Sequence, residues 1–161
     1  MASDLLMLVD GLKGEANDPD WPDAMALNSW SLGAQRNPVS AMGGQRGFSD
    51  THVSDLTVTC GIDQMTTGIT AMCVVTKEQP KTVQLIQRRP GGGATGETFL
   101  KITLTNTIFT SVQYASADTT LPTVSISMAY EQIEFEYLPQ STDSGQNKGS
   151  FSWTWNASAT R

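Results

Sequence analysis

The sequence predicts an all-β protein: a β-barrel or two-sheet sandwich of bent strands, with a single α-helix at about residues 67–77. Three observations lead to this prediction. Apolar and polar residues alternate with period two along most of the chain. Charged residues make up only 16% of a chain rich in Thr, Ser, Gln and Gly, which favours strands. Only one segment has helical spacing. The 161 residues fit one domain, 1–161, with its own core.

The alternation predicts seven strands, over residues 5–12, 25–35, 53–62, 81–89, 99–114, 123–137 and 151–155. The helix is predicted from four residues at i, i+3, i+4 and i+7: Ile69, Met72, Cys73 and Thr76. Thr66 is its expected N-cap. Pro80 ends it, because the residue before a proline avoids the helical region.

Three of these strands are irregular. The apolar positions of 25–35 change parity at Asn28-Ser29, and those of 123–137 change parity at Glu131-Gln132, so we expect a β-bulge at each place. Residues 99–114 at about 3.3 Å each would reach about 50 Å, more than a small domain spans. We therefore expect this strand to bend at Asn106 and to serve two sheets.

Residues 36–50 show no period, and glycines stand at 43, 44 and 47. We expect a long loop there. A loop of this length without secondary structure is usually functional or disordered, and the sequence leaves both interpretations open.

The charge of the chain excludes several partners. Its formal net charge of −6 repels phosphate, so nucleic acid is not an expected partner. No apolar run is long enough to predict membrane insertion. Residues 1–10 lack the basic and apolar regions of a signal peptide, so we expect folding in the cytoplasm. Cys60 and Cys73 are then expected to be reduced, small buried side chains, with a disulfide or a metal pair as the alternative.

Two motifs look like ligand sites. Residues 91–98 match the phosphate-loop pattern, but Glu97 replaces the lysine and a strand follows where a helix is required, so we expect a hairpin turn. Asp18, Asp20 and Asp23 are clustered as in calcium sites, but prolines interrupt them and no glutamate follows at loop position twelve. We expect a solvated acidic loop, no metal site and no bound cofactor.

No catalytic set is evident, so we do not expect an enzyme. The single histidine, His52, is expected on the surface, and no Gly-x-Ser-x-Gly motif accompanies it. Glu131, Glu134 and Glu136 offer paired carboxylates, but the last two alternate with apolar residues as on an exposed strand face.

The polar strand faces are unusual because they are short and uncharged. Exposed strands ordinarily carry more Lys and Glu, which also discourage edge pairing. The sequence leaves two interpretations open, a solvent face or a face that lines a pore or packs on a neighbouring copy. The residues concerned are Thr57, Thr59, Thr103, Thr105, Thr107, Ser125 and Ser127.

Seven stretches, in order from about residue 4 to 156, resemble the hemolysin-coregulated protein (Hcp) family of type VI secretion. They include a Gly-x-x-Lys-Gly-Glu turn, a Trp-Ser strand with Leu32 in place of the usual tryptophan, and a Tyr-x-Pro-Gln stop. The stretches are Asp10–Glu15, Asn28–Gly33, Val53–Thr59, Ile62–Ile69, Phe99–Val112, Val124–Gln140 and Trp155-Asn156. Residues 36–50 do not align with the family.

The resemblance implies a structural subunit of the type VI inner tube. Six copies would form a ring, and rings would stack inside a sheath, with a spike protein and effector proteins as further partners. The subunit would assemble in the cytoplasm and be secreted without a signal peptide. The alternative class is a carbohydrate- or ligand-binding β-barrel that uses Trp21, Trp153 and Trp155 for stacking.

The site residues follow from these two lines of argument. Because Trp30 and Leu32 point to the core, Ser29 and Ser31 face away from it by period two. The family's serine in the Trp-Ser pair looks into the bore, so both serines are candidates for lining the bore and contacting cargo. Candidates for contact with a neighbouring subunit or ring are Asn37, Gly43, Gly44 and Phe48.

Overall fold

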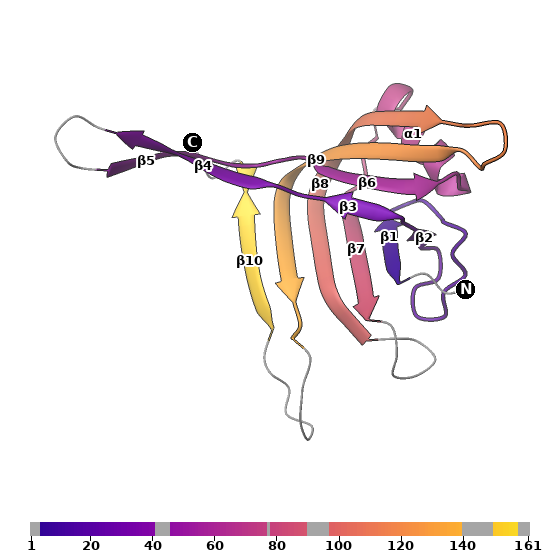
Figure 1. Ribbon diagram of the computed structural model, residues 1–161, viewed down its shortest axis with the longest axis horizontal. Coiled ribbons are helices and arrows are strands. Elements are labelled where there is room, and N and C mark those ends of the chain that lie inside the picture. The colour runs from indigo at the N-terminus through magenta and orange to yellow at the C-terminus, as the bar shows by residue number, and fades with distance from the viewer. Residues whose placement is uncertain (1–3, 41–45, 77, 90–96, 140–149, 158–161) are drawn as a thin grey trace, which may run out of the picture.

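The computed structural model describes residues 4–40, 46–76, 78–89, 97–139 and 150–157. It is an all-β structure with one helix, as the sequence predicts (Figure 1). One sheet has the order β2-β1-β7-β8-β9-β6-β3, and β10 also pairs with β9; β4 and β5 form a separate hairpin. The elements are β1 (Leu5–Val9), β2 (Met25–Ala26), β3 (Ser29–Ser31), β4 (Ala34–Ser40), β5 (Arg46–Val53), β6 (Leu56–Gly61), α1 (Gln64–Val74), β7 (Thr82–Arg89), β8 (Glu97–Ala115), β9 (Thr123–Tyr137) and β10 (Phe151–Asn156).

The sheet curls into a half-barrel because its two longest strands bend together. Asn106 of β8 lies in the left-handed region, with φ of 51°, and its side-chain amide donates to Glu131 Oε2 of β9 at 2.6 Å. Before the bend β8 pairs with β7, and beyond it the sheet continues through β9 to β6 and β3. Figure 1 shows the two parts crossing at a steep angle. The predicted bend at Asn106 is confirmed.

The core lies between the two parts of the sheet and under α1. Leu85, Ile102 and Ile133 contribute from one part, Val58 and Ile126 from the other, all essentially inaccessible to solvent. Burial of this apolar surface is the main force that holds the half-barrel closed.

The bend also changes which residues of β8 point inward. Leu100, Ile102 and Leu104 are buried before it, whereas Thr107 and Phe109 are buried after it. Alternation continued from Leu100 would place Ile108 on the core face as well, but Ile108 is 53% exposed. The expectation was wrong because one left-handed residue shifts the parity by one.

The same parity change occurs in β9, as predicted, but no bulge in β9 causes it. The register of β8 and β9 is continuous through Glu131, and it shifts between Phe109 and Ser111 of β8 instead. The two strands therefore change face together opposite Asn106, and the irregularity lies further along β8.

Residues 25–35 are not one strand with a bulge. β2 pairs with β1, while β3 pairs with β6, so the chain crosses from one edge of the sheet to the other within three residues. Met25 and Leu27 are buried and Trp30 is half-buried, so the apolar positions still face inward. The parity change reflects this transfer between partners.

The structure contains the predicted helix, but α1 begins three residues earlier than predicted, at Gln64. Its N-cap is Asp63, whose carboxylate accepts from the Met65 amide at 2.8 Å, and Thr66 Oγ1 accepts from the Asp63 amide at 3.2 Å. This is a capping box with Thr66 at N3, so Thr66 is not the cap itself. The described helix ends at Val74, before Pro80 is reached.

The predicted loop over 36–50 is instead a β-hairpin. Ala34 to Ser40 pairs with Arg46 to Val53, with a register shift between Arg36 and Asn37. Figure 1 shows the hairpin projecting from the half-barrel as a ribbon. The prediction failed because residues 36–50 show no alternation of apolar and polar residues from which strands could be recognised.

The other strands begin and end close to the predicted residues. β1 ends at Val9, not Leu12, because the Leu12 amide turns back to the Val9 carbonyl at 3.1 Å. Alternation along the predicted strand 53–62 would place Ile62 on the core face, but Ile62 is 50% exposed beyond the end of β6. No helix in the described part of the chain has the length and apolar character needed to cross a membrane.

Candidate functional site

The most distinctive surface is an uncharged polar face made by four adjacent strands. The register aligns two rows across β3, β6, β9 and β8. One row is Ser29, Thr59, Ser125 and Gln113, and the other is Ser31, Thr57, Ser127 and Ser111. We call these eight residues the hydroxyl face.

Alternation produces the hydroxyl face. Between its two rows lie Trp30, Val58, Ile126 and Val112, whose side chains point to the core. Thr57 and Ser127 are hydrogen-bonded through their hydroxyls at 3.3 Å. Seven of the eight side chains are short hydroxyls and the eighth is the amide of Gln113. All eight are neutral and can both donate and accept hydrogen bonds, so the face can contact varied surfaces without a preference for charge.

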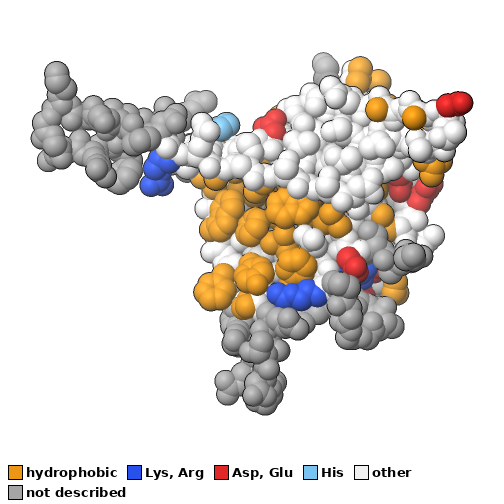
Figure 2. Space-filling model, in the orientation of Figure 1, with side chains coloured by type: hydrophobic (Ala, Val, Ile, Leu, Met, Phe, Trp, Pro, Cys, Tyr) orange, Lys and Arg blue, Asp and Glu red, His pale blue; other side chains and the backbone are white. Residues whose placement is uncertain are grey.

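The two serines predicted to face away from the core do so. Ser29 and Ser31 are exposed, opposite Thr59 and Thr57 in the register. In Figure 2 the upper surface, over β3, β6 and β9, is almost wholly without hydrophobic or charged side chains. Whether the face lines a bore is taken up under the proposed function.

Three of the threonines expected on such a face lie elsewhere. Thr103 and Thr105 stand before the bend, where charged neighbours such as Glu134 share their face, and Thr107 is buried. Ser111 and Gln113 belong to the hydroxyl face and were visible as polar positions in the sequence. Only the register of four strands, distant in the chain, shows that they lie beside Ser127 and Ser125.

The predicted contact residues lie in or beyond the hairpin. Asn37 is paired with Ser49, and Phe48 with Pro38, in the β4–β5 ribbon. Gly43 and Gly44 lie outside the described residues.

The sequence predicted a solvated acidic loop, but this prediction was wrong for Asp18, which is buried. Its Oδ2 accepts from Arg88 Nη2 at 2.6 Å, and both side chains are at most 3% exposed. Its Oδ1 accepts from the amides of Asp20 and Trp21 at 3.0 and 3.2 Å. Burial raises the pKa of Asp18, but hydrogen bonds from Arg88 and from the two amides, with the charge of Arg88, outweigh it, so the pKa is lowered. This carboxylate therefore serves the fold.

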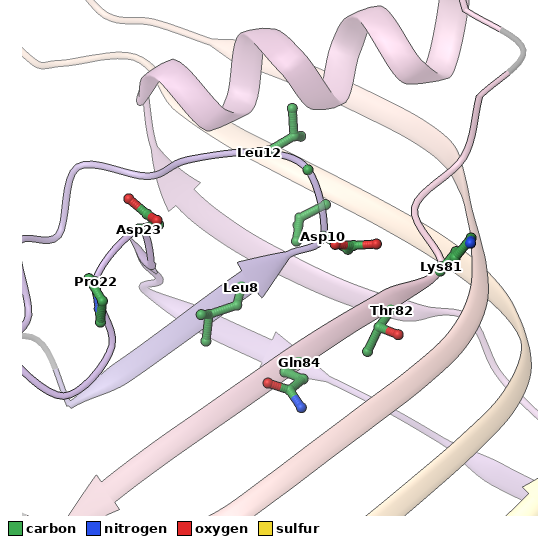
Figure 3. Close-up of a pocket in the computed structure, with 10 residues that line it drawn as sticks. Leu8, Asp10, Leu12, Pro22, Asp23, Lys81, Thr82 and Gln84 are labelled. Carbon is green, nitrogen blue, oxygen red and sulfur yellow. The ribbon is translucent and has the colours of Figure 1, made fainter.

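A pocket of about 500 Å³ lies between β1 and the 22–23 turn (Figure 3). Leu8 and Leu12 contribute apolar surface, and Asp10, Asp23 and Lys81 stand around it on separate segments, all three exposed. Exposed charges on separate segments are solvated and do not form a preorganised constellation of the kind that catalysis requires.

The remaining chemical candidates are also dispersed. His52 is exposed, as predicted, in a hollow of about 330 Å³ that Tyr130 and Trp155 also line. Cys60 and Cys73 are free thiols. Burial and, to a lesser extent, the charge of Asp63 raise the pKa of Cys60 to about 11, so this thiol stays protonated and unreactive at neutral pH.

The three tryptophans proposed for stacking do not form one platform. Trp153 stacks on Phe135 with centroids 5.3 Å apart, and Trp155 meets Tyr130 edge-on at 6.2 Å. Trp21 belongs to the loop before β2, at the opposite end of the strand order from β10. The comparisons below give the carbohydrate-binding alternative no support.

Comparison of the sequence with known proteins confirms the predicted family. Residues 6–137 match the family model described as type VI secretion system effector, Hcp. The chain is 28% identical over 157 residues to protein hcp1 of Pseudomonas aeruginosa, covering 97% of this chain and 96% of that protein.

The fold is shared with solved Hcp structures. A type six secretion system protein superposes with a TM-score of 0.85 at 21% identity, covering 99% of both chains. Hcp1 of Salmonella typhimurium superposes with a TM-score of 0.78 at 20% identity, covering 99% of this chain and 97% of that one. Because the family model spans most of the sequence and the fold agrees over nearly its full length, the chain belongs to the Hcp family, the tube proteins of the type VI secretion system.

Proposed function

We propose that this chain forms a hexameric ring whose bore is lined by the hydroxyl face, and that rings stack into a tube that carries effector proteins. The observation that carries the proposal is the hydroxyl face itself, eight aligned polar residues without a charge. In the bore of a tube that carries proteins, such a face would be hydrated and would lack the apolar patches that make passing proteins adhere.

The edges of the four-stranded part support closure into a ring. β3 has β6 as neighbour on one side only. β7 pairs with β8 up to Thr105, so the segment of β8 from Ile108 to Ala115 has β9 as its only strand partner among the described residues. These two edges lie at opposite sides of the hydroxyl face. Copies joined edge to edge would therefore continue the face around a ring, and closed pairing removes both exposed edges.

We extend the proposal to the partners that membership of the family suggests. A sheath would enclose the tube, a spike protein would lie at its tip, and the assembly would form in the cytoplasm before it is secreted. We also propose that the projecting β4–β5 hairpin, which carries Asn37 and Phe48, contacts a neighbouring subunit or ring.

Replacement of Ser31 tests the bore assignment. Ser31→Arg places a bulky charge on the hydroxyl face of every subunit, while the apolar parity of β3 is untouched. We expect hexamers in light scattering and rings in negative-stain images, but loss of a co-purifying effector.

The matched control is Ser152→Arg, since Ser152 is also an exposed strand serine but lies on β10. It should retain the effector. Equal retention by both variants would show that Ser31 does not line the bore. A stable monomer of the parent chain at micromolar concentration would contradict the ring.

A further inference from the structure

A second surface of this chain is aromatic and lies where the half-barrel stays open. We call it the aromatic mouth and define it as Trp30, Phe99, Phe135, Tyr137, Phe151 and Trp153. Phe135 stacks on Trp153 and lies 6.4 Å from Trp30, and Phe99 meets Tyr137 edge-on at 6.5 Å. Figure 2 shows hydrophobic side chains gathered below the hydroxyl face, with a basic side chain at their lower border.

The mouth is open because β3 is short and does not reach β10. Among the described strands, β3 pairs only with β6, and β10 pairs only with β9. Phe151 and Trp153 are therefore 69% and 41% exposed, although they lie on the core side of their strand. Aromatic side chains clustered in this way mark an interaction surface more often than a solvent face.

We propose that the aromatic mouth of one copy receives the C-terminal end of α1 from the next copy in the ring. This proposal rests on the hexameric ring proposed above. It names a contact between neighbouring copies that would lie on the core side of the sheet, opposite the hydroxyl face. Val74 and Val75 are the side chains that enter, and Trp153 with Phe135 forms the floor that they meet.

The topology places these two surfaces on opposite sides of the subunit. The mouth lies beside β3, since Trp30 belongs to both. α1 lies beside β8, where Tyr114 donates to the Thr66 carbonyl at 3.2 Å. β3 and the segment of β8 from Ile108 to Ala115 are the two edges of the hydroxyl face. If copies join edge to edge, the β8 edge of one copy therefore lies against the β3 edge of the next.

Both surfaces also lie on the same side of the sheet. Trp30 points away from Ser29 and Ser31, toward the core side. α1 buries Met65 and Ile69 in the core and so covers the same side. Neither surface interferes with the hydroxyl face, and contact between them would leave the bore unchanged.

The end of α1 is apolar where solvent would favour polar residues. Val74 and Val75 are 76% and 78% exposed. Two β-branched side chains at a helix end are stiff, so holding them against aromatic rings costs little side-chain entropy. Exposed apolar side chains of this kind suit contact with the exposed aromatic rings of the mouth.

The charges are complementary as well. Arg89 lies over the Phe99 ring with its guanidinium carbon 5.0 Å from the centroid, and it donates to the Tyr137 hydroxyl at 3.4 Å. No carboxylate in the described part of the chain forms an ion pair with it. The last turn of α1 has no basic residue, and beyond it the sequence places Lys77 and Glu78, whose formal charges offset each other. The negative end of the helix dipole therefore suits a rim that carries Arg89.

Photo-crosslinking from the mouth tests the contact. Trp153 is replaced by the photoreactive residue p-benzoylphenylalanine in full-length rings assembled from equal amounts of heavy- and light-isotope chains. We expect crosslinked peptides that pair heavy with light chains and end on residues 72–78. A crosslink between copies that maps to the β4–β5 hairpin or to any other segment would overturn the inference.

A substitution at the other surface gives an independent result. Val75→Lys should reduce the hexamer fraction at least tenfold at a given concentration, because it places a cation against Arg89. Leu121→Lys is the matched control, since Leu121 is 81% exposed in the loop between β8 and β9, and it should assemble normally. Normal assembly of Val75→Lys would count against the inference.

The outcomes separate this inference from the proposed function. If parent rings form and the crosslinks map elsewhere, the ring stands and the contact is wrong. If the parent chain forms no ring, the proposed function fails first.

Discussion

A buried ion pair ties the N-terminal loop to the sheet. Asp18 and Arg88 are 70 residues apart in the chain, yet the two side chains are almost entirely inaccessible. A buried pair of this kind contributes little relative to an apolar pair, but removal of one partner leaves an uncompensated buried charge.

Arg88→Met is therefore expected to lower the free energy of unfolding by about 3 kcal/mol. Arg89→Met is the control, because Arg89 is half-buried and outside the pair, and its loss should be smaller. Urea unfolding at fixed protein concentration measures both, since assembly makes stability depend on concentration. Equal losses would show that Arg88 has no special role.

Asp18 also predicts a loss of stability in acid. Its pKa is lowered below the ordinary 3.8, so its contribution is complete above that pH and is lost as the pH falls through the lower, folded-state pKa. The stability difference between the parent chain and Asp18→Asn should therefore be constant from pH 7 to 5 and shrink below about 3.8. Urea titrations across this range test it. A difference that does not depend on pH would contradict the lowered pKa.

At the scale of elements, we expect the β4–β5 hairpin to be the part whose stability depends most on assembly. An isolated two-stranded ribbon is at best marginally stable in water. The hairpin projects away from the half-barrel and pairs only with itself among the described strands (Figure 1).

Deletion of residues 39–46 should leave the fold of the subunit intact and impair assembly. The far-UV circular dichroism should keep its β-type spectrum, because the other strands do not pair with the hairpin. Electron microscopy should show fewer rings or unstacked rings. Tubes indistinguishable from those of the parent would refute a contact role for the hairpin.

The elements that the sequence predicts well are those with a core beneath them. β6, β7, β8 and β9 were located within a few residues because burial on one face imposes period two. β10 is mostly exposed, and its alternating aromatic residues located it. The hairpin was not located, since its sequence shows no such alternation. Asn106 was identified as the bend, but the parity shift that it causes was missed, and Ile108 was misassigned for that reason.

The site shows the same limit. Alternation alone predicts that Ser29 and Ser31 point away from the core. The identity of the residues beside them depends on the register of strands almost a hundred residues apart in the chain, which the sequence does not show. The Asp18–Arg88 pair was not predicted, because the sequence does not show which aspartate of the acidic loop, or which of the adjacent Arg88 and Arg89, is buried.

At the scale of the whole molecule, charge should govern how rings associate. Six copies of a chain of formal charge −6 carry −36. Like-charged rings repel, and the screening length shortens to about 10 Å at 0.1 M salt. Stacking should therefore strengthen from 10 mM to 500 mM salt in sedimentation measurements. Stacking that weakens steadily with salt would indicate that specific ion pairs join the rings.

The strand order has a consequence for how the chain is made. β1 needs β7, since Leu5 lies opposite Gln87, and β6 needs β9, since Leu56 lies opposite Met128. Strands made early on the ribosome therefore wait for partners that are synthesised much later, and such long-range pairing is slow. Until β7 is made, the apolar β1 has only the two-residue β2 as a strand partner, so its other edge is open to aggregation. The subunit thus becomes fit to join a neighbour only when nearly the whole chain has emerged.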